Sequence, residues 1–300
     1  MMLPAQVKIR EVVLRDGLQS WPIIVPTAKK IEIFRNLVEA GVKEMETTSF
    51  VSPGGIPQLA DAELLTKKLP KGYCRQLVLV PNLKGANRAY QAGADNFVVF
   101  ISASEEHNKA NLGQSISRSL YDLENISNFA ARHSIHINGS IVVAFGCPFS
   151  GDVPEEHVFR LAKTYILSGV ESITLGDTTG MATPTRVERL VKGFKDRFPD
   201  IELSLHFHNN RGTAMANVYA GLLSGCTVFD TSLGGIGGCP NVPQASGNLA
   251  TEDLICMLND MEIDTGLDLM KLIKSANALQ DYLGRTLPGQ VMKSGPRTSA

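Results

Sequence analysis

The segment VESITLGDTTGMATPTRVERLVKGFKDRFPDIELSLHFH, residues 170–208, places two apolar runs on either side of a helical pattern. The runs at 170–177 and 202–208 are rich in Val, Ile and Leu, which is typical of parallel strands that are covered on both faces. The helix predicted over 184–199 begins with a proline in its first turn and ends before a second proline. The segment therefore predicts a strand, a helix and a strand, the unit from which parallel α/β folds are built.

The same alternation extends along the chain. Strands are predicted at 7–14, 42–50, 76–81, 96–102, 136–145, 170–177, 202–208 and 228–233, with helical patterns between them. Eight such units favour a single α/β domain, a (β/α)8 TIM barrel over about 7–250. A doubly wound sheet is disfavoured because the first strand leads into LRDGLQ and not into a G-x-G-x-x-G turn. We expect a short C-terminal helical extension over 251–284 and a mobile tail over 285–300 within one catalytic domain, 1–300.

Composition limits the partners and the compartment. The 300 residues carry a formal net charge of −1, which argues against a nucleic-acid or membrane partner. The N-terminus does not have the pattern of a secretion signal, and no apolar run is long enough for a membrane span. The five cysteines have neither paired nor metal-type spacing, so we expect reduced thiols in a cytoplasmic protein. A homodimer or a higher homo-oligomer is compatible with the sequence.

Polar side chains gather at the predicted carboxyl ends of the strands, where the active sites of this fold lie. Strand by strand they are Arg15 and Asp16, Glu46 and Ser49, Asn82, Asp177, His206 and His208, and then Cys239 and Asn248 in a glycine-rich loop after the eighth strand. For the substrate we single out Gln19, Ser49, Asn82 and Thr174.

A divalent cation is the predicted common partner of four of these residues. Side chains alternate along a strand, so His206 and His208 point the same way. Together with Asp16 and Asn248 they offer two imidazoles, a carboxylate and an amide oxygen. Such a set leaves coordination positions open for substrate oxygens and favours Mg²⁺ or Mn²⁺. The alternative is ordinary interior hydrogen bonding of these groups.

Two further residues, Arg15 and Cys239, can be interpreted either as catalytic or as structural. The guanidinium of Arg15 suits a carbonyl oxygen that becomes an enolate, although an ion pair with Glu46 or Asp177 would also explain it. Cys239 lies among four glycines that permit loop movement, and its thiol could transfer a proton. A tight turn would account for the same glycines.

Seven motifs give the chain a resemblance to a known family. RDGLQ, ETTSFVSP, PNLKG, LGDTTG, HFH, GGIGGCP and ASGNLATEDL, spread from Arg15 to Leu254, together resemble the 3-hydroxy-3-methylglutaryl-CoA lyases of the metal-dependent TIM-barrel metallolyase superfamily. The resemblance implies an acyl-CoA substrate that is cleaved to acetyl-CoA and acetoacetate, as in leucine degradation.

The resemblance also implies roles for individual residues. Asp16, His206, His208 and Asn248 would bind the cation, and Arg15 would stabilise the thioester enolate. Cys239 would transfer a proton from a lid loop, while Glu46 and Asp177 would complete the polar network. His206 would act both as a ligand and as a proton carrier.

Departures from the family pattern bear on the acyl group. They lie at Leu14, Trp21, 102–115 and 209–211, and none removes a predicted ligand. The same chemistry on citramalyl-CoA or a longer 3-hydroxyglutaryl-CoA therefore stays open. A Claisen-condensing transferase of the isopropylmalate synthase type also stays open, as does a non-catalytic binding barrel, which predicts the loss of a ligand or of Arg15.

Overall fold

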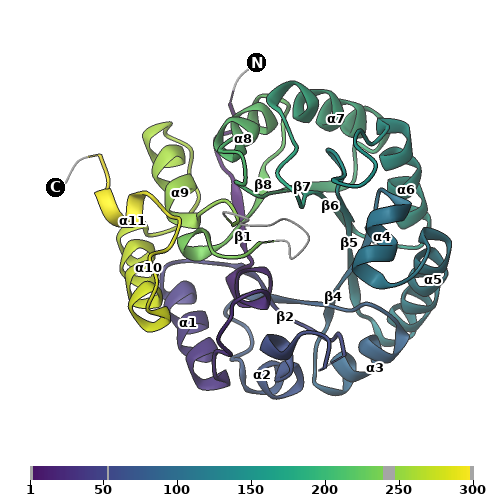
Figure 1. Ribbon diagram of the computed structural model, residues 1–300, viewed down its shortest axis with the longest axis horizontal. Helices are drawn as coiled ribbons and strands as arrows, with labels where there is room; N and C mark the ends of the chain where they lie inside the picture. Colours follow the sequence, from purple (N-terminus) through teal and green to yellow (C-terminus); the bar gives the residue numbers. More distant parts are fainter. Residues whose placement is uncertain (1–2, 53, 239–246, 298–300) are drawn as a thin grey trace.

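Eight parallel strands form a closed barrel in the computed structural model, which describes residues 3–52, 54–238 and 247–297. Strand β1 pairs with both β2 and β8, so the sheet has no free edge (Figure 1). The strands are β1 Lys8–Glu11, β2 Glu44–Ser49, β3 Arg75–Leu79, β4 Asn96–Ser102, β5 His136–Val142, β6 Ser172–Asp177, β7 Glu202–Phe207 and β8 Val228–Thr231. The predicted (β/α)8 barrel is confirmed.

Helices surround the barrel as an outer ring (Figure 1). They are α1 Thr27–Glu39, α2 Ala62–Lys68, α3 Leu83–Gln91, α4 Glu105–Leu112, α5 Ile116–His133, α6 Glu155–Leu167, α7 Pro184–Arg197 and α8 Ala214–Leu223. Helix α7 shows why these segments are helical, because Val187, Leu190, Val191 and Phe194 are buried at the spacing of one helix face. Among the described residues, no helix is both long and apolar enough to cross a membrane.

The first strand is shorter than predicted, and this difference shapes the site. β1 ends at Glu11, and Val13–Gly17 forms a π-helical turn, η1, instead of continuing the strand. The carboxylate of Glu11 accepts a hydrogen bond from the Val13 amide at 2.8 Å, which helps the chain to turn. Turns of this kind are frequent at functional sites. The turn brings Arg15 and its neighbour Asp16 to the same side.

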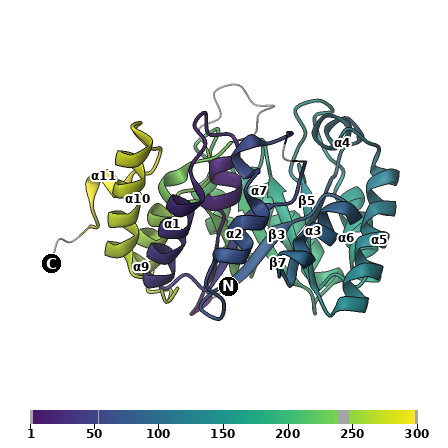
Figure 2. The ribbon, with the colours of Figure 1, turned by 90° about the horizontal axis from the view of Figure 1, so that it is seen from below.

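The C-terminal segment packs on one flank of the barrel beside α1 (Figure 2). It contains α9 Thr251–Asp260, α10 Leu269–Leu283 and a short α11 Val291–Ser294. Of the mobile tail expected over 285–300, the structure describes residues 285–297. Leu287 and Met292 are only 1% and 4% exposed, and the Asp253 carboxylate accepts a hydrogen bond from the Val291 amide at 2.7 Å. Apolar burial and this cap hold the segment against α9.

Candidate active site

A cavity opens at the carboxyl ends of the strands, and its walls differ in character. One side is polar and carries most of the predicted site residues, while the other is apolar. The polar lining consists of Arg10, Arg15, Asp16, Gln19, Glu46, Ser49, Asn111, Ser140, Thr174, Thr178, His206, His208 and Asp230; the apolar lining comprises Val51, Ile56, Leu79, Val98, Phe100, Leu112 and Val142. The predicted clustering at one rim is therefore what the structure shows for most of these residues.

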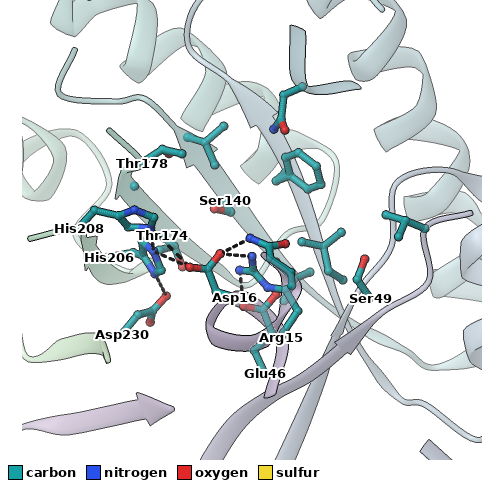
Figure 3. Close-up of a pocket in the computed structure, with 18 of the residues that line it drawn as sticks. Arg15, Asp16, Glu46, Ser49, Ser140, Thr174, Thr178, His206, His208 and Asp230 are labelled. Atoms are coloured by element: carbon teal, nitrogen blue, oxygen red, sulfur yellow. Dashed lines mark hydrogen bonds and ion pairs between the residues drawn. The ribbon is translucent and has the colours of Figure 1, made fainter. Parts of the chain in front are cut away.

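Three side chains converge on one point of the polar side (Figure 3). The Nε2 atoms of His206 and His208 lie 3.0 Å apart. Oδ2 of Asp16 lies 3.4 Å from Nε2 of His208 and 4.0 Å from Nε2 of His206. All three residues are buried. His206 on β7 and His208 just after its end thus point the same way, as their spacing predicts.

The spacing of these atoms fits a divalent cation. An octahedral ion with bonds of about 2.0–2.1 Å places neighbouring ligand atoms about 3 Å apart. The three ligand atoms of Asp16, His206 and His208 all lie within 4.8 Å of one another. With only two imidazoles and one carboxylate, the set leaves positions open for substrate oxygens, as in catalytic metal sites.

Asn248 joins this cluster, but with its amide nitrogen toward Asp16. Its Nδ2 donates to Oδ2 of Asp16 at 2.7 Å and to the carbonyl oxygen of Ile236 at 3.0 Å. Its Oδ1 is buried and has no partner among the described residues. A buried acceptor of this kind is costly unless something binds it. A half-turn of the amide would exchange the two atoms, so Asn248 is within reach of the predicted fourth ligand position.

Arg15 bridges two carboxylates. Its Nη1 donates to Oδ1 of Asp16 at 2.5 Å and its Nη2 to Oε2 of Glu46 at 2.7 Å. Gln19 also donates to Oδ1 of Asp16, at 2.8 Å. The ion pair with Glu46 therefore exists, and it holds the guanidinium against the cavity instead of away from it. Nε of Arg15 and Oε1 of Glu46 are buried without a partner among the described residues.

These contacts set the charge of Asp16. Burial alone would raise the pKa of the carboxyl, but Arg15 and the hydrogen bond from His208 hold it well below its usual range. Asp16 is thus an anion at neutral pH, which is the form that binds a cation.

Asp230 is a site residue that the sequence analysis missed. Its Oδ2 lies 3.3 Å from Nδ1 of His206, and its Oδ1 accepts a hydrogen bond from Nη1 of Arg10 at 3.3 Å. Carboxylates in this position orient a metal-binding imidazole and fix which nitrogen faces the ion. Burial lowers the pKa of His206, but the hydrogen bond to Asp230 and the charge of Asp16 raise it overall. An aspartate inside the buried run VFDTS was the available signal.

Three predicted site residues that the structure describes do not line the cavity: Asn248, which bonds to Asp16, and also Asp177 and Asn82. The carboxylate of Asp177 accepts hydrogen bonds from the amides of Met181 and Ala182 at 2.7 and 3.0 Å and so closes the loop after β6. Burial raises the pKa of Asp177 to about 6. The side chain of Asn82 caps α3 by accepting a hydrogen bond from the Gly85 amide at 3.0 Å.

Two of the residues predicted to contact the substrate, Ser49 and Thr174, do line the cavity. Ser49 lines the cavity from β2. Thr174 also lines it, with its hydroxyl accepting from Nη1 of Arg10 at 3.0 Å and bonded to Ser204 at 2.7 Å. Cys239 lies outside the described residues.

Comparison with known proteins points to one family. The HMGL-like family model matches residues 6–279. The chain is 42% identical to the hydroxymethylglutaryl-CoA lyase of Bacillus subtilis, covering 98% of this chain and 100% of that one. It is 38% identical to the (R)-citramalyl-CoA lyase of Chloroflexus aurantiacus, with 97% and 95% covered. A solved HMG-CoA lyase from Acinetobacter baumannii, in complex with coenzyme A and 3-methylmalate, superposes with a TM-score of 0.95 at 39% identity, over 100% of this chain and 98% of that chain.

Proposed function

The chain belongs to the HMGL-like family, and from this we propose that it is a metal-dependent carbon–carbon lyase that cleaves 3-hydroxy-3-methylglutaryl-CoA to acetyl-CoA and acetoacetate. The observation that carries the proposal is the convergence of Asp16, His206 and His208 beside the Arg15 guanidinium in one cavity. Mg²⁺ or Mn²⁺ is the expected ion, because both accept mixed oxygen and nitrogen ligands and leave positions open.

The reaction places two demands on the site. The C3 hydroxyl must lose its proton, and the C2–C3 electron pair must move onto the thioester as an enolate. A bound divalent cation would lower the pKa of the hydroxyl. Asp16, His206, His208 and Asn248 would hold that ion, with Asp230 orienting His206.

Glu46 is the group that we assign to the hydroxyl proton. Its Oε1 is buried, has no partner among the described residues and belongs to a residue that lines the cavity. His206 suits this step less well, because its Nε2 faces the ligand cluster and its Nδ1 faces Asp230. We therefore assign His206 to metal binding. Asp177 would support the site through the loop after β6 and not through contact with substrate.

Arg15 would stabilise the developing enolate. Its charge is permanent, and two of its nitrogens are held by Asp16 and Glu46, so the side chain is fixed before the substrate arrives. The enolate carbon then needs a proton. From its place in the glycine-rich sequence GGIGGCP, we assign this step to the thiol of Cys239, with Gln19, Ser49 and Thr174 contacting the acyl group.

Citramalyl-CoA is the second candidate substrate, since the relative from Chloroflexus shares 38% of its residues with this chain. The chemistry would be the same, with pyruvate in place of acetoacetate as the second product. We also propose a cytoplasmic location, which is favoured by the free state of the four described cysteines, Cys74, Cys147, Cys226 and Cys256.

The test is an assay of both thioesters with Mg²⁺ or Mn²⁺, following acetyl-CoA, acetoacetate and pyruvate. We expect acetyl-CoA and acetoacetate in equal amounts from 3-hydroxy-3-methylglutaryl-CoA. If citramalyl-CoA is cleaved faster, to acetyl-CoA and pyruvate, then citramalyl-CoA is assigned as the substrate instead. If neither ester yields acetyl-CoA, the proposed lyase activity is contradicted.

A further inference from the structure

Arg10 is a buried cation that the proposed reaction does not use. It lies on β1 and is only 2% exposed, yet it lines the same cavity as the ligand cluster. Its Nη1 contacts Ser204, one inward-facing position before His206 on β7, at 3.2 Å. Arg10 therefore occupies the floor of the cavity, just below His206.

Most of the Arg10 guanidinium is held by the protein. Nε donates to Oε1 of Glu44 at 2.6 Å, and Nη1 donates to Thr174, Ser204 and Asp230 at 3.0, 3.2 and 3.3 Å. Nη2, in contrast, is buried and has no partner among the described residues. A guanidinium has five N–H donors, and leaving charged donors unmatched in the interior is costly.

The charge of Arg10 is not fully matched by Glu44. That carboxylate is also 3.0 Å from Nζ of Lys8 and 3.5 Å from Nη1 of Arg75, so three cations share it. Lys8 also pairs with Glu202 at 3.2 Å and Arg10 with Asp230 at 3.3 Å, so these cations are balanced by carboxylates as a group. What stays open among the described residues is the donor Nη2 of Arg10. A purely structural role for the Arg10–Glu44 ion pair explains the buried guanidinium less well, because buried ion pairs contribute little to stability compared with apolar packing.

The floor beside Arg10 also has room for a ligand. The cavity is lined there by the small residues Ser140, Thr174 and Gly176 from β5 and β6. Figure 3 shows Ser140 and Thr174 beside the ligand cluster, on the same cavity. The cavity therefore extends down to the level of Arg10.

We propose that Arg10 determines substrate specificity by donating a hydrogen bond from Nη2 to the terminal carboxylate of the acyl group. The substrate class would be 3-hydroxyacyl-CoA esters with a free carboxylate at the far end of the acyl chain. The inference rests on the proposed lyase function and adds a contact to it. Carboxylate and guanidinium form short, charge-assisted hydrogen bonds, so the contact would discriminate strongly against an uncharged end.

The test compares two esters that differ at this end only. One is 3-hydroxy-3-methylglutaryl-CoA, and the other is 3-hydroxy-3-methylpentanoyl-CoA, which has a methyl group in place of the carboxylate. The measured quantity is the ratio of their kcat/KM values. Replacing the pair together, Arg10→Leu with Glu44→Leu, removes both members of the 2.6 Å ion pair and leaves His206 as the partner of Asp230. It should lower this ratio at least about 10-fold, mainly through a higher KM for the carboxylate ester.

Two further variants make the result specific. Arg10→Lys keeps the charge but lacks Nη2, so it should also lower the ratio, and it covers the case in which the double variant does not fold. Ser204→Ala removes a contact of Nη1 and the hydrogen bond to Thr174 but leaves Nη2 in place, so it should leave the ratio within about twofold of the wild type.

The outcomes separate the two proposals. Equal losses for both esters, accompanied by weaker Mn²⁺ binding, would show that Arg10 acts only through Asp230 and His206 and would overturn the inference. An unchanged ratio in Arg10→Lys and in the double variant would also overturn it. Failure of the wild type to cleave either ester would instead contradict the lyase itself.

Discussion

Two buried carboxyl groups, Glu11 and Asp16, lie five positions apart at the end of β1. Their surroundings shift their pKa values in opposite directions. Asp16 is 5% exposed and contacts Arg15, His208, Gln19 and Asn248. Glu11 is fully buried, and among the described residues its hydrogen-bond donors are all neutral. Its Oε1 accepts from the amides of Val13 and Leu233 at 2.8 and 3.0 Å, and its Oε2 accepts from the Thr251 hydroxyl at 2.6 Å.

The difference shows that burial alone does not identify a reactive carboxylate. Burial raises the pKa of Glu11 to about 8, because the hydrogen bonds that lower it do not offset the loss of water. For Asp16 the same burial is outweighed by Arg15 and His208, so its pKa falls well below the usual range. Asp16 is therefore ready to bind a cation, whereas Glu11 ties β1 to the segment after β8 and to α9.

Glu252 repeats the pattern of Glu11 at the same place. It is fully buried, and its Oε2 accepts a hydrogen bond from the Gly234 amide at 3.0 Å. Burial raises its pKa to about 7. Glu11 and Glu252 thus fix the consecutive amides of Leu233 and Gly234, where the glycine-rich sequence that contains Cys239 begins.

The largest expected effect comes from neutralising Asp16. Asp16→Asn keeps the shape but removes the anion that the cation needs, so kcat/KM for 3-hydroxy-3-methylglutaryl-CoA should fall at least about 10³-fold. Glu11→Gln is the matched control, and its kcat/KM should fall much less. A loss below about tenfold in Asp16→Asn would contradict the ligand assignment, since one tenfold step is only about 1.4 kcal/mol of barrier.

A smaller effect is expected at Arg15, which keeps Asp16 ionised. Arg15→Lys retains a positive charge, but one ammonium cannot reproduce the fork that spans Asp16 and Glu46. We expect kcat to fall about 10²-fold, with a much smaller change in KM, because the contact matters most when the enolate forms. Steady-state kinetics separates the two parameters. A raised KM with unchanged kcat would instead assign Arg15 to substrate binding.

The smallest effect concerns stability and pH at Glu11. Its folded-state pKa of about 8 lies above the ordinary value of 4.5, so the folded protein holds this proton more tightly than the unfolded chain does. The contribution of Glu11 to the free energy of unfolding is therefore fully present below about pH 4.5. It is lost as the pH rises toward 8, by at most about 1.4 kcal/mol per pH unit.

Glu11→Gln should remove this slope. Its amide can accept from Val13 and Leu233 and donate to Thr251, and it does not titrate. The free energy of unfolding can be measured with urea at pH 5, 6.5 and 8. The value for the variant should increase relative to that of the wild type as the pH rises. Parallel pH profiles for the two proteins would rule out the raised pKa of Glu11.

Much of the fold and part of the site follow from local patterns. The strand and helix alternation predicted the barrel because buried parallel strands and amphipathic helices have distinct periods. His206 and His208 were assigned together because their spacing in a strand places them on one face. Asp16 reached the cluster only through the π-helical turn at 13–17, which the predicted strand over 7–14 did not anticipate.

The remaining features depend on contacts between distant segments. Asp230 and Arg10 become site residues because β8 and β1 close the barrel and place them side by side. Asp177 ends β6 and Asn82 comes shortly after β3, as expected, but nearby backbone amides donate hydrogen bonds to their side chains. A polar residue after a strand can serve either the loop or the cavity, and only the path of the loop decides which.

The most direct test of the metal site is a Mn²⁺ titration followed by electron paramagnetic resonance on the wild type, Asp16→Asn and Glu11→Gln. Both variants lose one buried acid near the end of β1, so they differ chiefly in whether that acid faces the two histidines. We predict one Mn²⁺ per chain in the wild type and in Glu11→Gln, and an affinity at least about 10-fold weaker in Asp16→Asn. Equal Mn²⁺ affinity in all three proteins would contradict the claim that Asp16, His206 and His208 form the metal site.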